Sequence, residues 1–176
     1  RRASQLIRKQ RVKDAESLLE RHLISQPRAI ESRRLLTSLR IGQGYLKGAS
    51  QLIETGLNLQ PNDSGLTRLK ARIFLINAKP EQAVALLQQS PPALTDDAEY
   101  HQLHAAALQS LGDHDQASKI YYQLLQQDST QASWWVGLAV SLEALQQADK
   151  AREAYRNVLK IPAAAGTLKD FARQRM

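Results

Sequence analysis

The chain has 176 residues, 43% of them hydrophobic and 23% charged, so it can bury a sizeable core and is too apolar for a disordered segment. No stretch approaches the roughly 18 uninterrupted apolar residues of a membrane-spanning helix, and the absence of cysteine excludes disulfides and thiolate zinc sites. The formal net charge of +7 is uneven, with 12 Lys and Arg against 6 Asp and Glu in residues 1–63 but 1 against 4 in residues 98–131.

Small residues recur with a period of 34 along the whole chain, and this period organises all the predicted elements. The first set consists of five alanines: Ala15, Ala49, Ala83, Ala117 and Ala151. Four residues after each alanine, one turn along the same helix face, comes a bulky residue: Leu19, Ile53, Leu87, Tyr121 or Tyr155. The pattern predicts five helices in which a small residue permits close approach and a large one fills the space beside it.

Twelve residues before each alanine lies another small residue, which marks a preceding helix: Ala3, Thr37, Ala71, Ala105 or Ala139. Between the two helices is a turn position, where glycine readily supplies a left-handed helix end, occupied by Gln10, Gly44, Ala78, Gly112 or Gln146. Pro27 and Pro61 are expected to end the second helices of their repeats. Each repeat is therefore predicted to be an antiparallel helix pair that buries its apolar face only against its neighbours.

The predicted repeats span residues 1–29, 30–63, 64–97, 98–131 and 132–165, followed by a capping helix over 166–176. We expect them to form one all-α domain, a right-handed α-solenoid. The first repeat lacks most of its first helix and the chain starts without Met, so we expect a piece of a longer protein. Local distortion is expected where Arg40 replaces an apolar residue and where Pro91-Pro92 shorten a helix, and Thr167 is the expected N-cap of the capping helix.

This pattern resembles the tetratricopeptide repeat (TPR) family, most closely in the last two repeats. Residues 132–163 supply Trp135, Leu138-Ala139, Leu142, Ala151, Tyr155 and Val158, and residues 98–131 supply Ala105, Leu108, Gly112, Ala117, Tyr121 and Leu124. The resemblance covers nearly the whole chain and implies a scaffold that binds other proteins. We find no nucleophile elbow, phosphate loop, metalloprotease HExxH pair or paired carboxylates, so we expect neither an enzyme nor a bound cofactor.

In this family the first helices line a concave groove, and the resemblance implies which residues face it. They are Arg8, Arg34, Ser38, Arg68, Arg72, Gln102 and Gln109. Four arginines share this wall, and the planar guanidinium suits the carboxylates of an acidic partner segment in extended or helical form. The alternative is that exposed arginines only keep a helical repeat in solution.

A narrower resemblance concerns the stretch from Glu99 to Leu159, which is similar to the C-terminal repeats of MshN-type proteins for biogenesis of the MSHA (mannose-sensitive haemagglutinin) type IV pilus. This resemblance implies a bacterial inner-membrane protein with an upstream anchor, whose repeats lie on the periplasmic side within the pilus assembly machinery. The residues themselves fit the cytoplasm equally well, so the compartment stays open.

Other sites have weaker support in the sequence. His101, His104 and His114 suggest a metal site, but their positions favour packing and turn roles. Trp134 and Trp135 suggest a stacking platform, although core packing is favoured, with Trp134 the more exposed of the two. Tyr121, Tyr122 and Tyr155 are also expected in the core. Basic charge without an aromatic stripe argues weakly for nucleic acid, so a basic cytoplasmic module that binds nucleic acid or a regulatory protein stays an alternative. Self-association through a repeat face is another.

Overall fold

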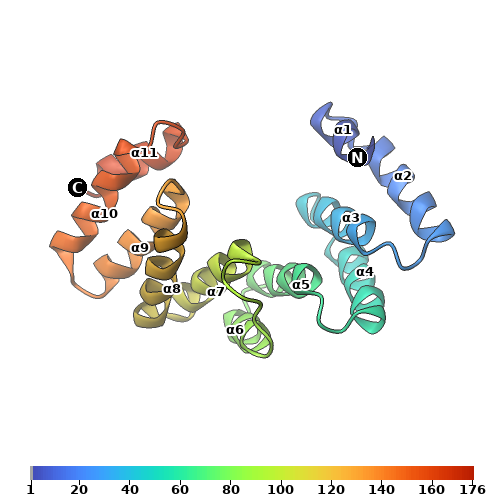
Figure 1. Cartoon of the computed structure of the whole chain (residues 1–176), viewed down its shortest axis with the longest axis horizontal. Helices are drawn as coiled ribbons and strands as arrows, with labels where there is room; N and C mark the ends of the chain where they lie inside the picture. Colours follow the sequence, from blue (N-terminus) through green and yellow to red (C-terminus); the bar gives the residue numbers. More distant parts are fainter. Residues whose placement is uncertain (1) are drawn as a thin grey trace. The chain divides into compact units, whose positions relative to one another are not determined.

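The computed structural model describes residues 2–176, which form eleven α-helices and no strand (Figure 1). The helices are α1 (Arg2–Arg8), α2 (Val12–Ser25), α3 (Ile30–Gly42), α4 (Leu46–Leu59), α5 (Ser64–Ile76), α6 (Pro80–Gln88), α7 (Ala98–Leu111), α8 (His114–Gln127), α9 (Ala132–Ala144), α10 (Ala148–Lys160) and α11 (Gly166–Gln174). The chain divides into two compact units with the boundary between Ala78 and Lys79. We call them the N-terminal unit, which contains α1 to α5, and the C-terminal unit, which contains α6 to α11. The prediction of a single domain stays a prediction.

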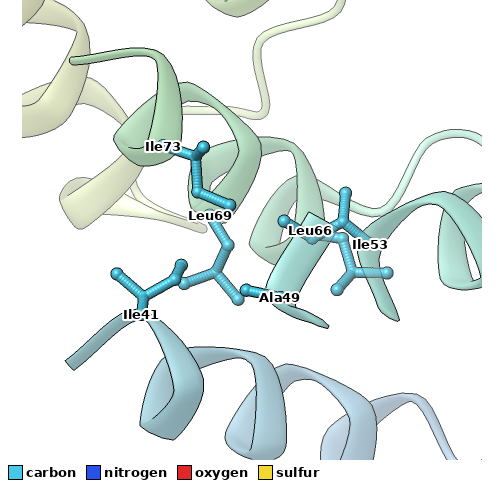
Figure 2. Close-up of a cluster of buried hydrophobic side chains, with 6 residues drawn as sticks. All are labelled: Ile41, Ala49, Ile53, Leu66, Leu69 and Ile73. Atoms are coloured by element: carbon cyan, nitrogen blue, oxygen red, sulfur yellow. The ribbon is translucent and has the colours of Figure 1, made fainter. Parts of the chain in front are cut away.

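In the N-terminal unit each helix packs on the next along the chain, and α3 also contacts α5. Figure 2 shows the buried cluster that joins α3, α4 and α5, made of Ile41, Ala49, Ile53, Leu66, Leu69 and Ile73. A second cluster joins α1, α2 and α3 through Ala3, Leu19 and Leu36. Burial of apolar surface at roughly 25 cal/mol per Å² therefore couples each helix pair to the next.

In the C-terminal unit the helices from α6 to α11 also pack in chain order, and α9 contacts both α7 and α11. The largest fully buried side chains here are Tyr100 and Tyr155. Tyr100 keeps its hydroxyl satisfied by donating to the Leu87 carbonyl on α6, at 2.9 Å. Helix α11 contacts α9 and α10 and buries its Ala172, which confirms the predicted C-terminal helix.

The predicted small and large core positions are confirmed in both units. The five alanines of the second helices are buried, and four of them have no exposed surface at all. The five bulky residues one turn later are at most 4% exposed. Because a helix backbone can approach closely only over a small side chain, the 34-residue period of the sequence translates directly into the helix packing.

The turn between the paired helices has the same conformation in every repeat. The residues with positive φ are Gln10 (59°), Gly44 (76°), Ala78 (54°), Gly112 (86°) and Gln146 (59°), which are the five predicted positions. In four of them the following amide closes the turn on a carbonyl five residues earlier, as Asp113 does on Leu108 at 2.9 Å. This hydrogen bond is typical of the Schellman motif. The left-handed end is therefore kept even where glutamine or alanine replaces glycine.

Of the two irregularities expected within helices, the structure shows one. Helix α6 ends at Gln88, ahead of Pro91-Pro92, so the predicted shortening is confirmed. The expected distortion at Arg40 is wrong, because α3 runs unbroken to Gly42. Arg40 forms an ion pair with Glu20 at 2.7 Å and lies 5.6 Å from the ring centre of Tyr45, so its charged end leaves the helix interface.

The expected N-cap of the last helix is also wrong. Helix α11 begins at Gly166 after the N-cap residue Ala165, which places Thr167 inside the first turn. The amides of Leu168 and Lys169 both donate to the Ala165 carbonyl, so the backbone of Ala165 starts the helix without a side-chain cap. No helix in the described part of the chain has the length and apolar character needed to cross a membrane.

Candidate partner-binding face

Two first helices of the N-terminal unit, α3 and α5, contact each other and present equivalent repeat positions. We call the surface formed by Arg34 and Ser38 of α3 and Arg68 and Arg72 of α5 the α3–α5 face. Ser38 and Arg72 are exposed, whereas Arg34 and Arg68 are half-buried. Arg8 is exposed at the end of α1. That these residues bind a partner stays a prediction.

Arg34 is held by carboxylates of its own unit. Its Nε donates to Asp63 Oδ1 at 2.8 Å, and its Nη1 donates to Glu31 Oε1 at 2.7 Å. Asp63 also accepts from the amide of Leu66 at 2.7 Å, which makes it the N-cap of α5. The guanidinium lies where a Cβ on Gly65 would stand, so glycine leaves the space for this pair. Arg34 therefore ties α3 to the start of α5 through one desolvated carboxylate.

The neighbouring Arg33 points into the unit and is only 5% exposed. Its Nη2 donates to the Pro27 carbonyl at 2.6 Å, and its stem occupies the space that a side chain at Gly56 would fill. Burial lowers the pKa of the Arg33 guanidinium from its usual value. The adjacent residues Arg33 and Arg34 thus have different structural roles: Arg33 is buried and binds the Pro27 carbonyl, whereas Arg34 binds Asp63. Neither role was evident from sequence spacing alone.

The two glutamines predicted for the groove lie on α7 in the C-terminal unit, where both form hydrogen bonds to other helices. Gln102 accepts from the indole Nε1 of Trp134 at 3.0 Å. Gln109 donates to the Gly137 carbonyl and to Ser141 Oγ, both at 2.8 Å, and accepts from the Tyr121 hydroxyl at 3.1 Å. These bonds give both amides a role in holding α9 against α7, while their predicted role in partner binding stays a prediction.

The hydroxyl that donates to Gln109 belongs to Tyr121, whose side chain is buried. Burial raises the pKa of Tyr121 to about 12, so its hydroxyl stays protonated and donates. The ring of Tyr121 occupies the place of a Cβ on Gly137, which brings α8 and α9 together. The amide of Gln109 then satisfies the polar edge of this contact from α7.

The expected order of exposure of the two tryptophans is wrong, and so is the expected burial of Tyr122. Trp134 is 7% exposed, whereas Trp135 is half-buried with its Nε1 donating to the Ser129 carbonyl at 2.8 Å. Tyr122 is 44% exposed, although the expected burial of Tyr121 and Tyr155 is confirmed. Helix α9 is apolar on almost every side, so periodicity could not decide which tryptophan faces the core.

The histidines lie where packing places them. His101 hydrogen-bonds through Nε2 to the Pro92 carbonyl at 2.9 Å. His104 has a buried Nε2 without a hydrogen-bond partner, and burial, with a smaller effect of His101, lowers the pKa of its imidazole. Among residues 2–176 no group of three or more His, Asp or Glu side chains is arranged to hold a metal ion.

Paired helices with buried small residues and recurring left-handed turns define an α-solenoid, a class of scaffold built from helical repeats. Two sequence models of the tetratricopeptide repeat match residues 40–107 and 98–131, together more than half of the chain. The chain belongs to the tetratricopeptide repeat family. No curated protein sequence matches it.

Solved structures share the fold at low sequence identity. TTC0263 from Thermus thermophilus is 19% identical with a TM-score of 0.81, and the match covers 98% of this chain and 94% of that one. YrrB, described as a TPR protein with an unusual peptide-binding site, is 17% identical with a TM-score of 0.71 over 98% of this chain and 88% of that one. Pseudomonas aeruginosa pilF is 13% identical with a TM-score of 0.81 over 98% and 83%. At these identities the matches show the fold alone.

Proposed function

We propose that this chain is a protein-binding scaffold whose α3–α5 face holds an acidic segment of a partner. TPR proteins generally mediate protein interactions, and YrrB is a structural neighbour described by its peptide-binding site. The observation that carries the proposal is the exposed Arg72 on α5, together with the exposed Ser38 on the contacting helix α3. Both occupy the same repeat position on two contacting helices, and Arg72 forms no ion pair with any described residue.

A carboxylate suits this position better than a phosphate-rich nucleic acid. Arg34 is already neutralised by Asp63 and Glu31, so the exposed part of the face offers a single separated guanidinium rather than a dense basic stripe. Nucleic acids reward several clustered cations, and aromatic stacking platforms usually accompany them on single strands. Ser38 supplies a hydroxyl that can donate to, or accept from, the partner backbone.

We further propose that the setting is assembly of a bacterial type IV pilus of the MSHA kind, with the repeats on the periplasmic side of the inner membrane as part of an anchored protein. The support is the resemblance of residues 99–159 to the repeats of MshN-type proteins.

A binding experiment with charge-matched variants tests the α3–α5 face. The purified chain serves as bait in envelope extract, together with Arg72→Glu and the control Lys47→Glu, which changes an exposed lysine on α4 by the same charge. Arg34 is left unchanged, because its loss would leave Asp63 buried without its partner. We expect Arg72→Glu alone to lose pilus-assembly proteins, identified by mass spectrometry.

The outcome also separates the alternatives. Recovery of the same proteins by all three baits would refute the role of Arg72, and recovery of ribonucleoproteins would favour the nucleic-acid alternative. A mass in solution that rises with concentration would favour self-association. Helical circular dichroism must be unchanged in both variants for the comparison to hold.

A further inference from the structure

The outer end of the Arg34 guanidinium is held by an exposed carboxylate of its own helix. Nη1 of Arg34 donates to Glu31 Oε1 at 2.7 Å, and the two residues lie three apart on α3. The side chain of Glu31 is 79% exposed. An exposed ion pair at this spacing contributes little stability, because it is screened by solvent and both side chains lose freedom when it forms. Glu31 is therefore released from Arg34 at small cost.

The inner side of the same guanidinium is held by a buried carboxylate. Nε and Nη2 of Arg34 donate to the two oxygens of Asp63, whose side chain is only 2% exposed. Asp63 is fixed in turn as the N-cap of α5 through the amide of Leu66. This two-point contact fixes the plane of the guanidinium. When Glu31 leaves, Arg34 therefore keeps its position and orientation.

Other ion pairs at the same spacing lack such an anchor. Arg11 binds Asp14, and Arg173 binds Asp170, with both side chains of each pair more than half exposed. No second carboxylate of the described residues holds either arginine. A ligand that binds an unanchored arginine has to order its side chain, which lowers the affinity. Arg34 is already ordered, so it is better prepared to bind a carboxylate of a partner.

The Arg34–Glu31 pair belongs to the α3–α5 face, which also contains the exposed Arg72 on the contacting helix α5. Helices in contact lie about 8–10 Å apart, and an extended chain advances about 3.3 Å per residue. Two carboxylates about three or four residues apart in one extended segment therefore span the distance between α3 and α5. One of them suits Arg72, and the other suits the place of Glu31 on Arg34.

We infer that Glu31 is an internal competitor of the partner. It holds the outer nitrogen of Arg34 in the free chain, and a second carboxylate of the bound acidic segment replaces it there. The inference rests on the proposed function, because it concerns the regulation of the same face. Since one carboxylate replaces another, the charge of Arg34 stays balanced in both states, and Glu31 lowers the affinity of the face for its partner.

Labelled peptides test this inference on the whole chain. The probes carry two glutamates separated by two, three or four residues in a glycine-serine background, and their matched versions carry glutamine at both places. The variants are Glu31→Ala and Glu31→Gln. The control is Glu54→Gln, which removes the same charge at an exposed residue of α4 that has no ion pair with a described residue. Fluorescence anisotropy at about 0.1 M salt measures each affinity.

The probe that binds best to the wild type should bind about two- to fivefold more tightly to Glu31→Ala, because the competing ion pair is absent. Glu31→Gln should show a smaller gain, since the glutamine amide still accepts a neutral hydrogen bond from Arg34. Glu54→Gln should stay within about 1.5-fold of the wild type, because distant exposed charges are screened over about 10 Å. The glutamine peptides should not bind.

NMR spectra of the wild type report the exchange directly. As the probe saturates the chain, the signal of the Glu31 carboxyl carbon should move towards that of the unpaired Glu54, which serves as the reference within the same chain. A merely structural role of Glu31 predicts neither this movement nor a gain in affinity, because the loss of a structural contact leaves binding unchanged or weakens it.

Four results would overturn the inference. They are the absence of saturable binding to both the wild type and Glu31→Ala, an unchanged or lower affinity in Glu31→Ala with intact circular dichroism, an equal gain in Glu54→Gln, and an unmoved Glu31 signal at saturation. Arg72→Glu separates the inference from the proposed function. If that variant binds the probe as the wild type does while Glu31→Ala binds it more tightly, the role of Arg72 fails and the competition by Glu31 stands.

Discussion

Replacement of Ala78 by glycine should stabilise the fold, although glycine usually weakens helical proteins. Ala78 has φ of 54° at the turn after α5, a conformation that costs an L-residue roughly 1–2 kcal/mol. Glycine removes this strain but adds about 0.5–1 kcal/mol of unfolded-state entropy. The expected net gain is about 0.5–1 kcal/mol. The exposed methyl of Ala78 makes no buried contact that the change would lose.

Ala85 provides the matched control, because it is also exposed but lies within helix α6. Ala85→Gly should lower stability by about 0.5–1 kcal/mol, the usual cost of glycine inside a helix. For a chain of this size the two variants should therefore shift the melting temperature in opposite directions by about 1–4 °C. Urea and thermal unfolding followed by far-ultraviolet circular dichroism measure both shifts.

The result that would refute this argument is a loss of stability in Ala78→Gly equal to that in Ala85→Gly. It would mean that the left-handed turn costs alanine nothing here. The same substitution at Gln10 and Gln146, which have φ of 59°, repeats the test in two further repeats. A gain at all three positions would show that strain at this turn is a property of the repeat.

Three further changes test packing, titration and the last helix. Gly137→Ala should cost about 1–3 kcal/mol in urea unfolding, because the new Cβ would overlap the buried Tyr121 ring, whereas Gly42→Ala, with open space at its Cβ, should be neutral or stabilising. Stability should fall as pH drops below about 6.5, since burial lowers the pKa of His104 in the folded chain and the unfolded chain therefore binds the proton first. The loss of stability levels off below the folded pKa. His104→Leu should reduce this loss, measured by urea unfolding above and below about pH 6.5. Arg175→Ala removes exposed contacts to Glu143 and to the Phe171 ring, so amide exchange in α11 should accelerate with at most about 1 kcal/mol of global loss; unchanged exchange would show that these contacts do not hold the helix.

The helical packing could be predicted because it depends on side-chain size at fixed intervals. A backbone that crosses another closely tolerates only a small residue, and this requirement repeats wherever the helix pair repeats. The left-handed turn follows the same geometry, which explains why Gln10 and Gln146 adopt it without glycine. These features need only the period of the sequence.

Polar partners could not be predicted, because they depend on side-chain geometry between repeats. Arg34 and Asp63 are 29 residues apart, and Gln109 and Ser141 are 32 apart, so no single-helix pattern connects them. One signal was available for Asp63, which follows Pro61 and precedes a helical stretch as an N-cap would. Its second role as the acceptor of Arg34 becomes evident only when α3 and α5 are placed together.

The polar contacts within the N-terminal unit decide which of its arginines remain exposed and without an ion pair. Counted by sequence, every arginine there contributes equally. In the structure Arg34 and Arg40 are neutralised by carboxylates of the same unit, and Arg33 is buried. Among the described residues of the N-terminal unit, the exposed arginines without an ion pair are Arg2, Arg8, Arg21, Arg28 and Arg72.

These exposed charges belong to several different elements of the unit. Arg2 and Arg8 belong to α1 and Arg21 to α2, while Arg72 lies on α5 of the α3–α5 face. At an ionic strength near 0.1 M, screening over about 10 Å makes distant exposed cations act independently. For the proposed partner we therefore expect carboxylates that are placed individually, as on an acidic protein segment with a defined shape, rather than the even charge of a uniform polyanion.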